Sequence, residues 1–338
     1  MVKNKIPEAQ YVITNECPLA KKSKYCVVPQ FTVKEPKDWK IKTQALQALY
    51  DNGVRVLKFL GGEPFCVPGI ENIIEFSNKL EGLNYAITTN AVDQKKILGI
   101  VDRQGIKGVF VSLDSLNSYA HKAEAQELWG CSTLKSKMGI RLLLALKGKV
   151  EFLGANTIVH AGNLDQLPEI LEFLTEIGAT MNICPLIWGK INGNYVYRTS
   201  NKPKTSLGEK DRKRLEKAMK KLVKMKHQGY NLGCPDFYAL NLAQYSIPRM
   251  SWRCGQIKEL PILRIGPDLN LMICSDLRGK RISRFNVFDL QDKYDQILKA
   301  WKTDPQRLYC CSHPKGGCYW SNIVRGNANK GRGGSLRE

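Results

Sequence analysis

Cysteines stand in two groups along the chain, and their thiols are the side chains best suited to binding a metal. Cys17 and Cys26 form the first group. The second group contains Cys254, Cys274, Cys310, Cys311 and Cys318. Thiolates are ordinary ligands of iron–sulfur clusters and of zinc, and clustered cysteines in a chain without a signal peptide more often hold metal than form disulfides. The cysteine pattern therefore raises metal binding as a candidate role, although Cys17 and Cys26 taken alone are better read as two unrelated thiols in a loop.

A second set of candidate ligand-binding residues follows short apolar runs of the chain. Its members are Gly61, Gly62, Glu63, Pro64, Asn90, Ser112, Asp114, Asn163 and Leu186. Paired glycines let a backbone come close to a ligand, and the Glu63 carboxylate can accept hydrogen bonds from an ammonium group. Asn90, Ser112 and Asp114 end in suitable hydrogen-bonding groups. Capping of strand ends is the alternative role for each of these three.

The apolar runs themselves are predicted to be strands of a parallel sheet. The predicted strands are Tyr11–Thr14, Arg55–Leu60, Tyr85–Thr88, Gly108–Ser112, Glu151–Val159 and Met181–Cys184. Helical periodicity between them predicts helices at about Asp38–Asp51, Ile70–Leu80, Asp93–Val101, Ser132–Ala145 and Leu164–Ile177. Six such units predict an α/β fold, a partial (β/α)6 barrel whose ligands collect at the carboxyl ends of the strands.

The chain divides into four segments by composition. The predicted barrel occupies residues 1–188, and a basic linker and helix, the helix from about Leu207 to His227, occupy residues 189–233. Residues 234–324 form a cysteine-rich α+β extension with a strand pair, Leu260–Ile265 and Asn270–Ile273, and a helix near Leu290–Trp301. Residues 325–338 read as a flexible basic tail.

The overall composition is that of a globular protein with a large positive charge. Of the 338 residues, 43% are hydrophobic and 25% are charged, which excludes a disordered chain. The net charge of +21 indicates either a polyanionic partner or a lysine-rich solvated surface. No apolar run of about 18 residues and no signal peptide occur, so we expect a cytoplasmic protein that does not enter a membrane.

The loop from Val12 to Cys26 and the strand-end residues resemble the radical S-adenosylmethionine (radical SAM) superfamily from about Ala9 to Leu186. The resemblance implies a [4Fe–4S] cluster held at the positions of Cys17, Ser23 and Cys26, with one iron open to S-adenosylmethionine. The Gly61-Gly62-Glu63-Pro64 turn would contact the methionyl amino group. Asn90, Ser112 and Asp114 would line the ribose and methionyl groups, Asn163 would lie nearby, and Tyr25 and Leu186 would contact the adenine.

Ser23 departs from the family, which has cysteine at this position. A serine hydroxyl is harder than a thiol and more difficult to deprotonate, so it should weaken the cluster. Three explanations stay open: an engineered substitution in an active enzyme, a natural serine ligand, or a degenerate protein that has lost its chemistry.

The second cysteine group resembles the twitch extension, a shortened relative of the SPASM domain. This resemblance implies an auxiliary [4Fe–4S] cluster bound by Cys254, Cys274, Cys318 and one of the pair Cys310 and Cys311. A structural zinc site is the alternative. Cys234 could also serve as a ligand, and Leu269 stands where the family usually has a hairpin glycine.

The resemblance implies that the cluster reduces S-adenosylmethionine and that the resulting 5′-deoxyadenosyl radical takes hydrogen from a substrate. A flavodoxin or ferredoxin would supply the electron. We expect a peptide or protein substrate, with RNA or a nucleotide as the alternative and a non-catalytic binding protein as the alternative of another class. Cys66 and Cys184, near strand ends, are candidate hydrogen donors to a substrate radical.

Overall fold

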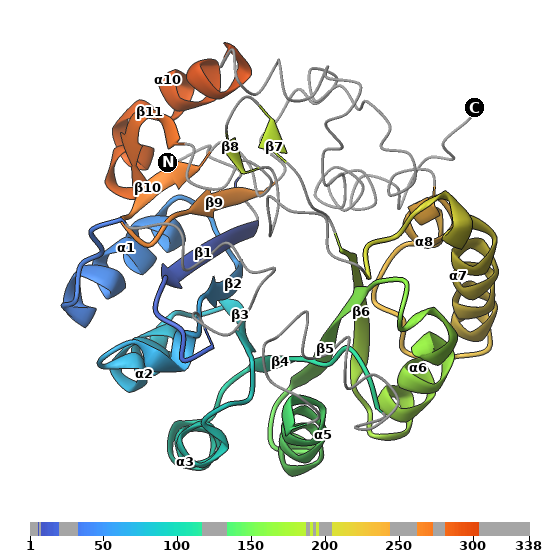
Figure 1. The fold of residues 1–338 in the computed structure, drawn as a ribbon. Helices are drawn as coiled ribbons and strands as arrows, with labels where there is room; N and C mark the ends of the chain where they lie inside the picture. The colour runs from blue at the N-terminus through green and yellow to red at the C-terminus, as the bar shows by residue number, and fades with distance from the viewer. Residues whose placement is uncertain are drawn as a thin grey trace.

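A computed structural model describes residues 6, 8–19, 33–116, 134–186, 190–191, 194–195, 205–243, 262–272 and 281–303. Its centre is a curved sheet (Figure 1). Six parallel strands lie side by side in chain order: β1 (Glu8–Thr14), β2 (Val56–Gly61), β3 (Asn84–Thr89), β4 (Gly108–Ser112), β5 (Phe152–Val159) and β6 (Thr180–Pro185). The predicted parallel sheet is confirmed.

Helices cover the outer face of this sheet (Figure 1). They are α1 (Trp39–Asp51), α2 (Ile70–Lys79), α3 (Gln94–Gln104), α5 (Leu134–Leu146) and α6 (Leu167–Glu176), the last preceded by a 3-10 turn at Leu164–Gln166. Each follows a strand, as in the predicted β/α units. The described strands do not close into a complete barrel, because the sheet ends at β6 on one side.

The alternation of side chains along the strands explains why the helices pack on this face. Tyr11, Phe59 and Tyr85 come from three neighbouring strands, and their rings lie 5.8–6.3 Å apart between centroids. The Tyr85 hydroxyl donates to Asn78 Oδ1 of α2, so the three rings face the helices. Their burial, and that of Leu46 on α1, forms the core between sheet and helices.

The predicted basic helix is present as α7 (Arg212–His227), after a 3-10 turn at Glu209–Asp211. It packs beside α6 and the short helix α8 (Asp236–Leu240), and its Leu215, Met219 and Leu222 are buried. A small hairpin of β7 (Lys190–Ile191) and β8 (Asn194–Tyr195) lies apart from the main sheet. None of the helices in the described ranges is long and apolar enough to cross a membrane.

The predicted C-terminal strand pair is confirmed, and it continues the barrel sheet. β9 (Leu263–Ile265) runs parallel to β1, and β10 (Asn270–Met272) and β11 (Arg281–Asn286) follow in antiparallel pairs. The full strand order is therefore β11-β10-β9-β1-β2-β3-β4-β5-β6. The helix α10 (Leu290–Thr303) follows β11 and packs beside α1 (Figure 1). Leu269 in the β9–β10 turn has a left-handed backbone with φ of 66°, the conformation for which glycine is favoured.

Candidate functional site

Cys17 lies three residues beyond the carboxyl end of β1, where it is partly exposed. Its sulfur accepts hydrogen bonds from the backbone N–H of Leu19 and from the side-chain amide of Asn90, both at 3.4 Å. Asn90 follows β3, so the two residues meet at the same edge of the sheet. Hydrogen bonds to a sulfur favour its thiolate form, which is the form that binds iron. The surroundings of Cys17 therefore fit a cluster ligand.

The Gly-Gly-Glu-Pro turn packs directly against the backbone that leads to Cys17. The Gly62 N–H donates to the Thr14 carbonyl at 2.8 Å, and the Glu63 N–H donates to the Glu16 carbonyl at 2.7 Å. A Cβ on Gly61 would lie 2.6 Å from the Thr14 carbonyl oxygen. The sequence suggested that these glycines make room for a ligand. The structure shows that they make room for the chain's own backbone.

Glu63 joins the end of β2 to the end of β3. Its side chain is 3% exposed and accepts from the Thr89 hydroxyl at 2.9 Å and from the Asn90 N–H at 2.7 Å. Pro64 begins a 3-10 turn, and the Phe65 N–H in that turn also donates to Glu63, at 3.3 Å. Glu63 thus holds Asn90 in the position from which it reaches the Cys17 sulfur.

Asp114 and Asn163 form a separate network between the ends of β4 and β5. Asp114 Oδ1 accepts from the Ile158 N–H at 2.7 Å, and the Asn163 side-chain amide donates to the carbonyls of Asp114 and Ile158 at 2.9 and 2.7 Å. These hydrogen bonds link strand ends, and for Asp114 they match strand-end capping, the alternative to ligand binding. Ser112 lies at the end of β4 opposite Asn156.

Leu186 lies at the sheet edge after β6, where its N–H donates to the Val159 carbonyl at 2.9 Å. It is buried. The structure therefore brings Cys17, Glu63 and Asn90 into one hydrogen-bonded group, and it places the other described candidates farther along the same edge of the sheet.

Most of the predicted metal ligands lie outside the described residues. These are Ser23, Cys26, Cys254, Cys274, Cys310, Cys311 and Cys318, and Tyr25 lies outside as well. Within the described part of the chain, no three cysteine, histidine or carboxylate side chains come close enough to hold a metal ion. The ligand sets of both clusters stay predictions.

The two cysteines predicted as hydrogen donors occupy different elements. Cys66 lies in the 3-10 turn after β2, where burial and the nearby Glu63 carboxylate raise the pKa of its thiol. This shift keeps the thiol protonated, which is the form able to donate a hydrogen atom. Cys184 is partly exposed near the end of β6, opposite Ile158 of β5.

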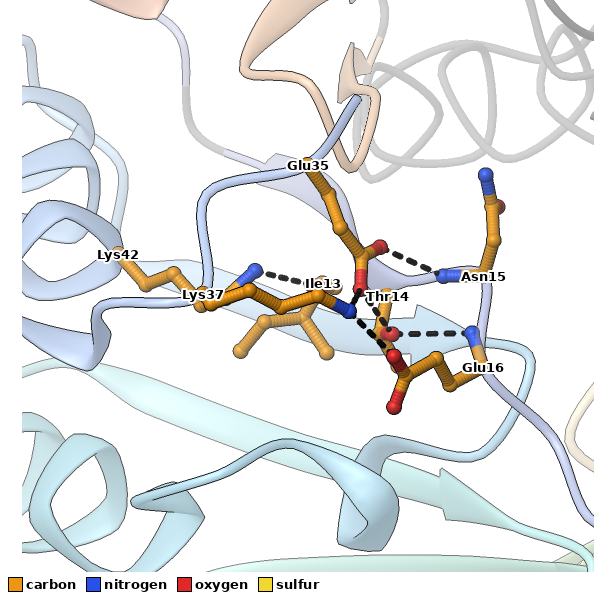
Figure 2. Close-up of polar contacts among 7 residues, drawn as sticks. All are labelled: Ile13, Thr14, Asn15, Glu16, Glu35, Lys37 and Lys42. Carbon is orange, nitrogen blue, oxygen red and sulfur yellow. Dashed lines mark hydrogen bonds and ion pairs between the residues drawn. The ribbon is translucent and has the colours of Figure 1, made fainter. Parts of the chain in front are cut away.

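Sequence reasoning missed a group of charged residues on the other side of the Cys17 backbone (Figure 2). Glu35 and Lys37 from the segment before α1 contact Thr14–Glu16, and Lys42 of α1 donates to the Ile13 carbonyl at 2.7 Å. The sequence gives no signal for these contacts, because the partners are separated by 20 to 29 residues and share no periodicity.

Comparison with known proteins finds a family model that matches part of the chain. Residues 11–174 match the radical SAM superfamily. A probable GTP 3′,8-cyclase from Methanococcus vannielii is 30% identical over 145 residues, which is 42% of this chain and 46% of the relative. PqqA peptide cyclase from Gluconobacter oxydans is 25% identical over 170 residues, which is 49% of this chain and 45% of the relative. The chain thus matches less than half the length of these curated relatives.

Solved structures share the fold over nearly the whole chain. Streptococcus suis SuiB bound to S-adenosylmethionine has a TM-score of 0.62 at 21% identity, covering 95% of this chain and 75% of SuiB. The anSMEcpe structure with bound AdoMet has a TM-score of 0.58 at 16% identity, covering 94% of this chain and 88% of the neighbour. These likenesses confirm the predicted α/β fold of the partial-barrel type.

Proposed function

We propose that the chain is a radical SAM enzyme that binds a [4Fe–4S] cluster and S-adenosylmethionine to modify a peptide or protein; the match of residues 11–174 to the radical SAM superfamily supports this. The observation that carries this proposal is the Cys17 sulfur, which sits at the sheet edge and accepts hydrogen bonds from Leu19 and Asn90. A thiol at that position, facing two donors, is suited to ligate iron. Ser23 and Cys26 would complete the ligand set.

The cluster, when bound, supplies the electron that cleaves S-adenosylmethionine to methionine and a 5′-deoxyadenosyl radical, which takes hydrogen from the substrate. The residues of the chain would bind the cluster and orient its ligand Cys17. Cys17 provides a thiolate, and the amide of Asn90 stabilises negative charge on its sulfur. Glu63 fixes Asn90 through a 2.7 Å hydrogen bond to its backbone. Cys66, protonated because burial raises the pKa of its thiol, belongs to this proposal as a hydrogen donor.

The binding site for S-adenosylmethionine is part of the same proposal. Glu63 and Asn90 lie beside Cys17, and the solved neighbours with the same fold include one with S-adenosylmethionine bound. Ser112 lies farther along the same sheet edge, at the end of β4. Asp114 and Asn163 would support this binding site by joining the ends of β4 and β5 through their hydrogen bonds.

An auxiliary [4Fe–4S] cluster, with structural zinc as the alternative, is the second metal centre that we propose. The β9–β10 hairpin lies between Cys254 and Cys274 in the chain and has the antiparallel form expected for a twitch extension. Metal analysis separates the alternatives, because an auxiliary cluster adds about four irons with sulfide to those of the first cluster, whereas a structural zinc site adds zinc and no iron.

A peptide or protein is the substrate class that we favour. SuiB is described bound to its precursor peptide SuiA, with a TM-score of 0.63 to this chain, and PqqA peptide cyclase is among the sequence relatives. The second candidate is a nucleotide, because several relatives at 28–30% identity are GTP 3′,8-cyclases. A flavodoxin or ferredoxin reductant and a cytoplasmic location belong to the same proposal.

Deuterium transfer distinguishes the substrate classes. The reduced enzyme, with Ser23 and as Ser23→Cys, would be incubated with S-adenosylmethionine and either a uniformly deuterated peptide fraction or a deuterated nucleotide fraction. Deuterium in 5′-deoxyadenosine from the peptide fraction supports the proposal, and deuterium from the nucleotide fraction alone supports the second candidate. Polyanion binding without any cleavage of S-adenosylmethionine would favour a non-catalytic binding protein.

A further inference from the structure

The carboxylate of Glu35 binds the backbone directly before Cys17 (Figure 2). One oxygen accepts from the Thr14 hydroxyl and the other from the Asn15 N–H, both at 2.9 Å. The side chain of Glu35 is 9% exposed, so these bonds are largely shielded from water. A shielded carboxylate that accepts two hydrogen bonds holds its partners more firmly than an exposed ion pair does.

The contacts of Glu35 extend toward Cys17 through Thr14. The Thr14 hydroxyl donates to Glu35 and at the same time accepts from the Glu16 N–H at 3.0 Å. Lys37 pairs with the carboxylates of Glu16 and Glu35 and joins them from the solvent side (Figure 2). Thr14 and Asn15 therefore bind Glu35 directly, and Glu16 is linked to it through the Thr14 hydroxyl.

The opposite side of the same backbone is already fixed by the barrel. The N–H groups of Gly62 and Glu63, in the turn after β2, donate to the carbonyls of Thr14 and Glu16 at 2.8 and 2.7 Å. The backbone leading to Cys17 is thus held between the barrel on one side and Glu35 on the other. Glu35 lies outside the buried core of the barrel, so its substitution removes no core side chain.

We propose that Glu35 is a positioning residue for the cluster ligand Cys17, acting through Thr14 and Asn15 on the backbone that aims the sulfur at Asn90. This inference rests on the proposed role of Cys17. Glu35→Gln keeps the size of the side chain but removes its charge and turns an amide NH₂ toward one of the two donors. Hydrogen bonds to charged groups are strong enough that we expect iron release to become roughly 10- to 100-fold faster.

The test uses the full-length chain carrying Ser23→Cys as the parent, reconstituted anaerobically with iron and sulfide. Glu35→Gln is compared with Glu71→Gln, which makes the same charge change at the exposed ion pair with Arg103. Iron release to a chelator, the electron paramagnetic resonance spectrum of the reduced cluster, and its midpoint potential are measured. The thermal midpoint of each cluster-free protein is measured beside them.

We expect Glu35→Gln to release iron faster and to change the spectrum, with a raised midpoint potential because a negative charge is lost near the cluster. Glu71→Gln should match the parent. Thr14→Val should also release iron faster. In the double variant with Glu35→Gln, the increase in release rate should be smaller than the product of the two single increases, because both substitutions break the same contact. Thr14→Ser keeps the hydroxyl and should restore release to near the parental rate.

Parental iron release, spectrum and potential in Glu35→Gln would overturn the positioning role. The role is equally overturned if Glu35→Gln only lowers the thermal midpoint of the cluster-free protein and leaves the cluster properties unchanged. A parent that binds no iron contradicts the proposed function itself, so the two failures are distinguishable.

Discussion

Gly62 has no space for a methyl group, and Gly62→Ala is expected to displace the backbone that carries Cys17. A Cβ at position 62 would lie 2.7 Å from the Asn15 carbonyl oxygen and closer still to that of Glu16. Backbone atoms cannot move aside as the tip of a flexible side chain can. The turn or the Cys17 segment must therefore shift, and the 2.7 Å bond from the Glu63 N–H to Glu16 breaks.

The cost follows from two contributions. The two backbone hydrogen bonds across this contact contribute about 1 kcal/mol each, and overpacking of a tight site costs about 1–3 kcal/mol. We therefore expect Gly62→Ala to lower the free energy of unfolding by about 3–5 kcal/mol. Since folded proteins are stable by about 5–15 kcal/mol, the variant should fold but unfold at much lower denaturant.

Gly99→Ala is the matched control, because it makes the same chemical change inside α3. A Cβ there meets the end of the Arg103 side chain at 3.2 Å, and alanine is favoured over glycine in a helix by about 1 kcal/mol. Urea unfolding of the cluster-free variants, followed by tryptophan fluorescence, compares the two. A free energy of unfolding of Gly62→Ala within about 0.5 kcal/mol of that of the parent protein, together with the same iron content after reconstitution, would refute the predicted displacement.

Three further predictions concern single side chains. Asn90→Asp replaces the amide donor beside Cys17 with a carboxylate, so the midpoint potential of the reconstituted cluster should fall; a redox titration that shows no change would contradict this. Glu63→Gln removes the charge that accepts from two donors at the end of β3 and should lower the free energy of unfolding by about 2–4 kcal/mol in urea. The Asn286 N–H lowers the pKa of Asp289, so this carboxylate stabilises the fold above about pH 4 and loses its contribution as the pH falls through its folded pKa. Asp289→Asn should reduce the loss of stability measured between about pH 6 and pH 2, and an unchanged acid profile would count against the capping role.

The barrel could be predicted from the sequence because the strands are short apolar segments in which, as in β2 and β6, alternate side chains are buried. Such strands read as short apolar runs, and the predicted ends lie within a few residues of the observed ones, as for Arg55–Leu60 against Val56–Gly61. The basic helix begins later than predicted, at Arg212. The residues before it form a 3-10 turn in which the Asp211 carboxylate accepts from the Gly208 N–H at 3.0 Å.

Contacts between distant parts of the chain could not be predicted. The sequence contains the β9–β10 strand pair but does not show that β9 lies beside β1, a pairing that brings Arg264 next to Gln10 across 254 residues. The Glu35–Thr14 contact likewise has no periodic pattern to reveal it. The close approach of Gly61 and Gly62 to the backbone of Thr14–Glu16 was likewise not predicted, because sequence reasoning cannot tell an approach to the backbone from one to a ligand.

The most direct test of the proposed function is an anaerobic determination of iron, sulfide and zinc. It is made on the reconstituted protein with Ser23 beside Ser23→Cys, with formation of 5′-deoxyadenosine assayed in both. About four irons rising to about eight, with nucleoside formed by the cysteine form, is the result that two [4Fe–4S] clusters predict. Zinc alone, with no iron and no nucleoside in either form, would contradict the radical SAM chemistry.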